Sequence, residues 1–231
     1  MTLTEPNPER ESATDGGCEQ FGFSNVSRRL TNRILGATLL CFTLLGLLTR
    51  SASAYRTNAD SLEIVSTERV VWPQASVELQ LGSIETSPYT PEQTRLAVEE
   101  AITEWSSPSC SSLYLELLAS QGTMAVPGDE LNTVQWQSDG WLGGPSAPGY
   151  TDVQLAKSTD GSWVIAEADI YLNSNHASFI ESGKSSEYLR AIIAHELGHV
   201  VGLTHPCEMV AAADVPVCGA GNEAQLMHPI S

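Results

Sequence analysis

Basic residues are scarce in this sequence, and the scarcity narrows the partners that the chain can have. Its 231 residues include 11 Lys+Arg against 28 Asp+Glu, which gives a formal net charge of −17 at pH 7. Such a chain cannot neutralise a run of phosphates, which argues against nucleic acid as a partner. Internal repeats and low-complexity tracts are also lacking, which argues against solenoids and propellers. Hydrophobic residues make up 42% of the chain, enough for the core of one packed domain.

A hydrophobic run long enough to cross a membrane is lacking too. The apolar stretch 34–48 has 15 residues, short of the ~20 that a spanning helix needs. Three arginines within 28–33 precede it, and the small residues Ser-Ala-Ser-Ala at 51–54 follow it. This order is typical of a secretory signal peptide, here with cleavage near Ala54. The alternative is an uncleaved single-pass anchor, which would make the membrane a partner.

The region ahead of this signal is unusually long, since the polar residues 1–25 precede the basic residues of the signal. We therefore hypothesise that translation starts near Val26. Residues 1–54 hold five acidic and five basic side chains, so the whole charge of −17 belongs to residues 55–231. We expect a leader over 1–54, followed by an acidic, monomeric protein that is secreted or periplasmic.

Cysteine is sparse as well, with five in the chain. Cys18 and Cys41 fall in the leader, and Cys110, Cys207 and Cys218 remain. Outside the reducing cytosol, Cys207 and Cys218 can close a short loop that stabilises the fold by roughly 3 kcal/mol. Cys110 is then left as a buried apolar group or a free thiol. Three thiols do not settle the pairing, which stays open at this point.

Apolar periodicity predicts an α+β domain. Thr90, followed by Pro91 and Gln93, predicts a capped helix that ends at 106–108. Ser185 opens a second helix, which has apolar residues at three- and four-residue spacing. Alternating or apolar runs predict strands over 77–81, 113–117, 134–136, 151–157 and 163–173, the last two joined as a hairpin by the turn Asp160-Gly161. The strand that precedes the second helix resembles an edge strand, and residues 203–231 are expected to form loops.

The second helix carries His-Glu-Leu-Gly-His at 195–199. Because His195 and His199 are four residues apart, their rings project from one face and can reach one ion. Gly202 lets the chain leave the helix in a backbone conformation that other residues resist. The sharp exit is expected to bring His205 back toward the same ion.

Three neutral imidazoles leave a fourth position open for water, which distinguishes a catalytic zinc site from a closed structural one. Glu196, beside the first ligand, can take a proton from that water as a general base. The full spacing H-E-x-x-H-x-x-G-x-x-H fixes five positions, for a chance occurrence on the order of 1 in 10⁴. The sequence therefore predicts one catalytic zinc ion.

This signature resembles that of the metzincin zinc endopeptidases, and a Met-turn candidate, Leu-Met-His-Pro at 226–229, follows it. The Leu-Met-x-Pro form is similar to that of the matrixins, with His228 where they usually carry tyrosine, while Pro206 is similar to the serralysins. The resemblance implies that His195, His199 and His205 are zinc ligands and that Glu196 is a general base. It also implies that Met227 forms an apolar floor beneath the ligands.

The resemblance covers 70–229 and implies a twisted mixed sheet, an N-terminal helix, an active-site helix and a short C-terminal part with the Met-turn. Residues 55–70 would be a linker or short pro-segment, and 71–231 the peptidase domain. A protein or peptide substrate would bind extended along an exposed strand edge. The sequence departs from the family in stopping four residues after Met227, without the usual C-terminal helix.

Three alternatives stay open. A non-catalytic exported or membrane-tethered module with a structural or relic zinc site is one, although the intact Glu196 counts against it. His228 is either a plain turn residue or a group that approaches the metal. Loop acids can bind Ca²⁺, but no D-x-D-x-D-G spacing supports this, so solvated acids are the default.

Overall fold

The computed structural model describes residues 56–57, 70–108, 111–121, 124–181, 185–209, 215–219 and 225–229, all within a compact unit that spans Ser51–Ser231. The expected leader with its cleavage site, Cys18 and Cys41, and the remaining Cys110 lie outside these residues. Among the helices that are described, none has the length and apolar character needed to cross a bilayer.

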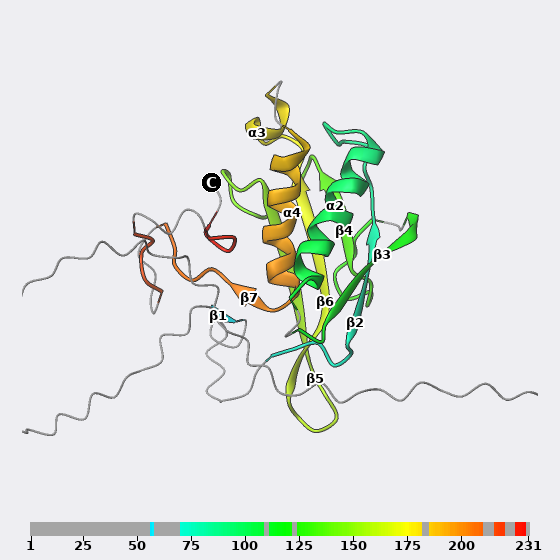
Figure 1. Cartoon of the computed structure of the whole chain (residues 1–231), viewed down its shortest axis with the longest axis vertical. Coiled ribbons are helices and arrows are strands. Elements are labelled where there is room, and N and C mark those ends of the chain that lie inside the picture. Colours follow the sequence, from blue (N-terminus) through cyan, green and yellow to red (C-terminus); the bar gives the residue numbers. More distant parts are fainter. Residues whose placement is uncertain are drawn as a thin grey trace, which may run out of the picture. The chain divides into compact units, whose positions relative to one another are not determined.

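The described residues are built around a five-stranded sheet (Figure 1). Its strands are β2 (Ser76–Leu81), β3 (Tyr114–Gln121), β4 (Thr133–Gln137), β5 (Gly149–Lys157) and β6 (Trp163–Asn173). They lie in the order β3-β2-β4-β6-β5. β2 pairs in parallel with β3 and β4, β4 pairs in parallel with β6, and β5 is antiparallel to β6. The strands expected from apolar periodicity are all present, with bounds shifted by a few residues.

β5 forms one edge of this sheet, and β3 forms the other. The expectation that the strand before the second helix is an edge strand is therefore wrong. That strand is β6, which lies between β4 and β5. Residues 167–173 of β6 are all buried. The strands β4 and β5 flank β6, and this part of the sheet is covered on both faces. Residues 167–173 alternate between polar and apolar, but such alternation shows which side chains share a face and not whether the strand lies at an edge of the sheet.

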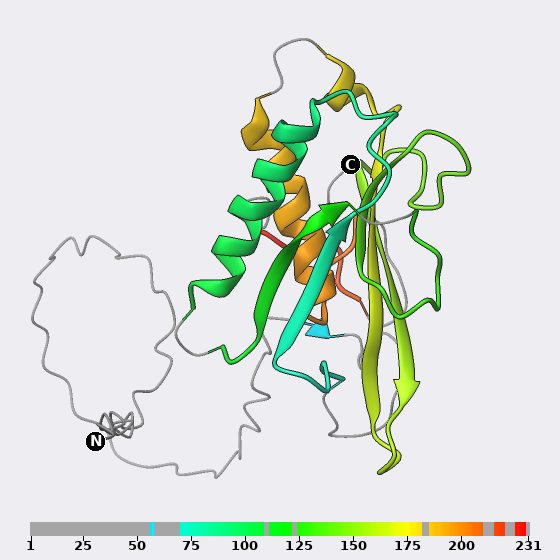
Figure 2. The ribbon, with the colours of Figure 1, turned by 90° about the vertical axis from the view of Figure 1, so that its right-hand side faces the viewer.

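Two helices pack against each other and against the same face of the sheet (Figure 2). α2 (Pro91–Ser106) begins with the expected capping box. The Thr90 hydroxyl accepts from Gln93 N at 3.2 Å, and Gln93 Oε1 accepts from Thr90 N at 2.9 Å. α4 (Ser186–Val200) is the expected second helix and ends just before Gly202.

The core lies between the two helices and the sheet. Each fully buried aliphatic side chain in it contributes about 1.5–3 kcal/mol of transfer free energy. A mixed sheet with helices on one face is the expected α+β class. The buried side chains include Val77, Leu79, Val98, Ala101, Leu115, Ile170, Leu172, Ile193 and Leu197.

α4 is also anchored by polar contacts along its length. The indole Nε1 of Trp72 donates to Val200 O at 2.7 Å, and that of Trp105 donates to Ala194 O at 2.7 Å. Arg190 forms an ion pair with Glu104 on α2. These contacts hold α4 against α2 and against the residues that precede β2.

Three short elements have too few residues to show a period in the sequence. β1 (Arg56–Thr57), within the expected linker, pairs antiparallel with β7 (Leu203–Thr204). α3 (Ala177–Ile180) follows β6. His176 caps α3, because its Nδ1 accepts from Ser178 N at 3.3 Å.

Candidate metal centre

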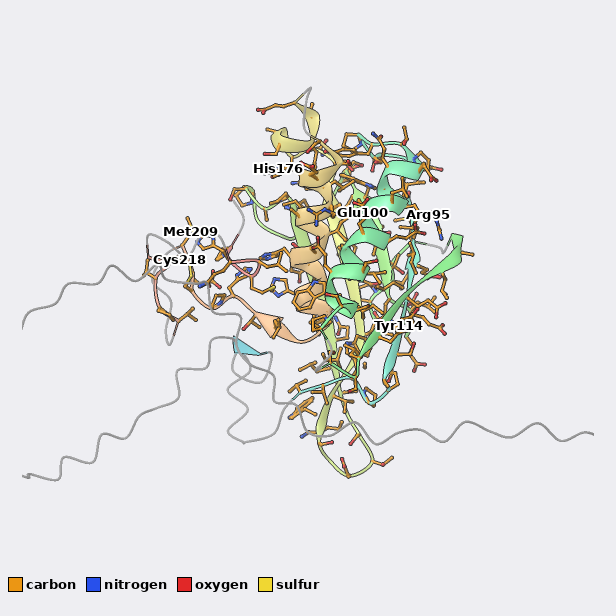
Figure 3. All side chains as sticks on the ribbon, viewed as in Figure 1. Arg95, Glu100, Tyr114, His176, Met209 and Cys218 are labelled. Carbon is orange, nitrogen blue, oxygen red and sulfur yellow. A yellow bond between two sulfur atoms is a disulfide. The ribbon has the colours of Figure 1, made fainter. Side chains whose placement is uncertain are left out.

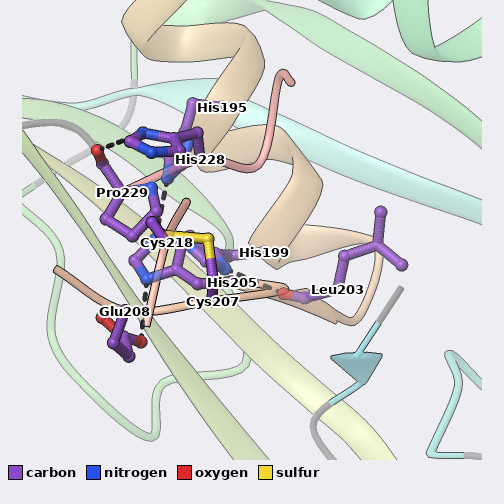
Figure 4. Close-up of polar contacts among 9 residues, drawn as sticks. All are labelled: His195, His199, Leu203, His205, Cys207, Glu208, Cys218, His228 and Pro229. Atoms are coloured by element: carbon purple, nitrogen blue, oxygen red, sulfur yellow. Dashed lines mark hydrogen bonds and ion pairs between the residues drawn. A yellow bond between two sulfur atoms is a disulfide. The ribbon is translucent and has the colours of Figure 1, made fainter. Parts of the chain in front are cut away.

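Three imidazoles meet beside the C-terminal half of α4 (Figure 4). His195 and His199 lie one turn apart on α4, and His205 follows β7 directly. The ring centroids are 5.0 Å apart for His195 and His199, 5.1 Å for His195 and His205, and 5.0 Å for His199 and His205. The Nε2 atoms of His195 and His205 are 3.1 Å apart. The structure thus brings all three expected ligands together.

The turn after α4 carries the chain to His205. Gly202 has φ = 95°, in the left-handed region, and its N–H donates to His199 O at 2.9 Å. A Cβ on Gly202 would lie 3.3 Å from Ile165 Cδ1 and 3.4 Å from Val70 O. Glycine therefore suits both the conformation and the space at this position.

The outer nitrogen of each ring faces an oxygen acceptor. A hydrogen on each Nδ1 leaves each Nε2 with a free lone pair, and these lone pairs point into the shared space. The acceptors are Leu226 O at 2.7 Å from His195 Nδ1, Leu203 O at 2.8 Å from His199 Nδ1, and Glu208 Oε1 at 3.2 Å from His205 Nδ1.

Burial keeps two of the rings neutral. The pKa of His195 is lowered to about 3, first by burial and then by His199, against the opposing effect of the Leu226 carbonyl. The pKa of His199 is lowered to about 4, also chiefly by burial. Neutral imidazole is the form that binds metal, so protons do not compete for these two ligands at neutral pH.

The three rings fit a metal ion. The Nε2 lone pairs of His195 and His205, 3.1 Å apart, repel each other unless a cation lies between them. Two ligands at about 2.0–2.1 Å from one tetrahedral ion would be about 3.3 Å apart, close to this distance. Imidazole donors suit zinc, copper, iron and nickel. The site can therefore hold a transition-metal ion.

Glu196 lies between the histidines and the edge strand β5. Its side chain is 5% exposed, and the Thr151 hydroxyl donates to its Oε2 at 2.6 Å. A Cβ on Gly149 would lie 2.5 Å from Glu196 Oε1. Only glycine lets the β5 backbone approach the carboxylate so closely.

The protonation of Glu196 depends on this environment. Burial raises the pKa of Glu196 to about 7, and the hydrogen bond from Thr151 opposes the rise because it stabilises the carboxylate. A carboxyl group with a pKa near neutrality can take up and release a proton at physiological pH. The group beside the three rings is therefore suited to general acid–base chemistry.

A pocket of about 330 Å³ opens over this cluster. The three rings and Glu196 line one of its walls. β5 and the loop before it also line the pocket, through Gly143, Pro148, Gly149, Tyr150 and Thr151 among others.

The turn at 225–229 packs against α4. Met227 is 4% exposed, and a Cβ on Gly198 would collide with its Sδ. That Cβ would also lie 2.9 Å from Met227 Cε and 3.0 Å from Trp105 Cζ2. Met227 thus fills the space beside a glycine that stands between two of the three histidines in the sequence, and Leu226 supplies the acceptor for His195.

A disulfide joins Cys207 and Cys218, one of the pairings that the sequence leaves open. One ring nitrogen of His228 lies within 4.8 Å of both sulfurs, and its Nδ1 donates to Pro229 O at 2.9 Å. Because the two sulfurs are bonded to each other, they are not free to bind a metal. His228 lies beside the disulfide, and it also acts electrostatically on His195, where it contributes to the lowered pKa of that ring.

Four residues at the site were given no role by the sequence. Gly149 and Thr151 come from β5, which lies far from Glu196 in the chain, and no local pattern marks them. Gly198 lies inside the histidine motif at a position that the motif leaves variable. Glu208 is a carboxylate three residues after His205, and this short spacing is the one feature of the sequence that could have indicated a contact between them.

Comparison of this chain with protein-family models and with curated proteins found no match. The case for a function therefore depends on the geometry and chemistry of the site.

Proposed function

We propose that this chain is an exported, zinc-dependent endopeptidase of the metzincin type. The observation that carries the proposal is the convergence of three imidazoles next to one buried carboxylate, within a pocket bounded by an edge strand. The signature over 195–205 and the Met-turn at 226–229, which resemble those of the metzincins, agree with this arrangement.

In the proposed reaction, the residues of the chain bind, orient and transfer a proton. His195, His199 and His205 would hold zinc through their Nε2 atoms, and the bound ion would supply Lewis acidity for a water molecule and for the substrate carbonyl. Glu196 takes the proton of the attacking water on its carboxylate and delivers it to the departing amine. Thr151 holds Glu196 Oε2, which fixes the orientation of the carboxylate for both transfers.

The edge strand β5 provides the place for an extended substrate. It pairs with β6 on one side, and in the part of the chain that the structure describes no strand pairs with its other side. A peptide can add to such an edge through backbone hydrogen bonds. Since Gly149 and Thr151 contact Glu196, a peptide on β5 would place one of its bonds beside this carboxylate.

Digestion of a mixture of unstructured peptides by the purified chain with zinc tests the proposal. New internal termini, identified by mass spectrometry, are the expected result. Removal of end residues alone would contradict an endopeptidase, and a complete lack of cleavage would contradict a peptidase.

The Thr151→Val variant is expected to move the acidic limb of the pH–rate profile to higher pH. A general base works only when unprotonated, so activity is present above the pKa of Glu196, which burial raises, and is lost as the pH falls through it. Removing the hydroxyl removes the hydrogen bond that lowers this pKa. The measurement is kcat/KM against pH, with Thr103→Val on the exposed face of α2 as the control. An unmoved limb would show that Thr151 does not act on Glu196.

Export remains part of the proposal. The Cys207–Cys218 disulfide supports it, because such bonds persist outside the reducing cytosol. The mature chain is expected in the culture medium with Tyr55 as its first residue, as read by terminal mass spectrometry. A chain that keeps residues 34–48 and sediments with membranes would support the anchored alternative instead.

A further inference from the structure

The acceptor of His205 differs in kind from those of the other two rings. His195 and His199 donate to backbone carbonyls, whereas His205 Nδ1 faces the Glu208 carboxylate at 3.2 Å. A carboxylate at the outer nitrogen fixes the tautomer and the ring orientation and makes the imidazole a better metal ligand. Glu208 is thus placed to influence the metal through His205.

The segment that holds Glu208 is a closed structure, which we call the strap and which consists of residues 205–209 and 215–219. Glu208 N donates to Pro216 O at 2.9 Å, and Cys218 N donates to Glu208 O at 2.9 Å. The Cys207–Cys218 disulfide lies directly beside these bonds. Met209 and Cys218 of the strap lie on the side of α4 away from Tyr114 of β3 (Figure 3).

Because His205 and Glu208 are partly exposed, the contact between them depends on how firmly the strap holds Glu208. The side chains of His205 and Glu208 are 25% and 36% exposed. On a freely moving chain, a contact between two side chains this exposed would contribute little stabilisation, because ordering both side chains costs entropy. The disulfide and the two backbone bonds have already removed much of that freedom from the chain that carries Glu208.

We propose that the strap sets the metal affinity of the site. The disulfide holds Glu208 against His205, and Glu208 acts as a positioning residue for this ligand. This inference rests on the proposed function only in that the three rings bind zinc, and it adds a means by which the affinity is controlled.

The first test is the Kd of the full mature chain for Zn²⁺, measured by competition with a chromogenic chelator. Glu208→Ala is expected to raise this Kd by about 10- to 100-fold. Glu208→Gln is expected to raise it less, because the amide oxygen still accepts from His205 Nδ1. Glu187→Gln, at an exposed position in the first turn of α4, is the matched control and should leave the Kd unchanged.

The second test asks whether the disulfide acts through Glu208. Cys207→Ala/Cys218→Ala, which keeps an apolar side chain at the buried position 207, is expected to raise the Kd. Adding Glu208→Ala to that variant should raise it little further, because the carboxylate is no longer held in place. Fully additive losses would overturn the role of the strap. The Glu208→Ala comparison uses the chain with its disulfide intact, so it remains decisive if the double alanine variant does not fold.

The outcomes separate this inference from the proposed function. An unchanged Kd in Glu208→Ala overturns the inference and leaves the peptidase proposal standing. The expected Kd changes without any peptide cleavage by the wild type support the inference and overturn the peptidase proposal. A wild-type chain that binds no Zn²⁺ overturns both.

Discussion

The Glu196→Gln variant is expected to cleave peptides about 10²- to 10⁴-fold more slowly than the wild type while keeping its zinc. Glutamine has nearly the same shape as glutamate, and its amide oxygen can still accept from Thr151, so the neighbouring His195 should stay in place. The amide cannot take up and return a proton at neutral pH. The measurement is kcat/KM on one peptide substrate, with metal analysis of the same sample.

Glu187→Gln makes the same chemical change on the same helix, at an exposed position in its first turn. It should cleave at the wild-type rate. Wild-type rates from Glu196→Gln would show that Glu196 is not the base. Loss of zinc together with activity would point instead to a role for Glu196 in holding the ligands.

The His199→Ala variant is expected to lose zinc, because two imidazoles remain of a site that uses three protein ligands. Zinc at about 1,000 times its Kd stabilises a folded chain by about 4 kcal/mol. For a domain of this size, that corresponds to a rise in Tm of about 10 °C. The wild type should show this rise on addition of zinc, and His199→Ala should not.

His176→Asn is the control for this experiment. His176 caps α3 and does not belong to the three-ring group, and asparagine is a good N-cap residue. This variant should keep the full zinc-dependent rise in Tm. A strong chelator added to the wild type should reproduce the behaviour of His199→Ala. An equal rise in all three chains would mean that the metal binds elsewhere.

Much of the fold could be predicted because its main elements are local in sequence. The capping box, which occupies only the four residues from Thr90 to Gln93, marks the start of α2. The alternation in β2 shows directly which side chains face the core. The order of the strands could not be predicted in this way. The place of β6 inside the sheet depends on pairing with β4 and β5, and alternation along a strand shows which side chains share a face but not which strands are its neighbours.

The same distinction applies to the site. His195, His199 and His205 fall within one helix and the turn that follows it, so their spacing alone indicates that they meet. The acceptors of His199 and His205 are also local, but that of His195 and the partner of Glu196 come from further away. Leu226 is 31 residues from His195, and Thr151 is 45 residues from Glu196. Contacts over such separations arise from tertiary packing, which short motifs do not encode.

The anchoring of α4 has a consequence for how a substrate enters. Two indoles donate to the helix backbone near its C-terminal end, and Met227 contacts it so closely that Gly198 leaves no room for a side chain. A helix held in this way behaves as a rigid wall. Any widening of the pocket must then come from the other side, where the loop that leads into β5 lines it.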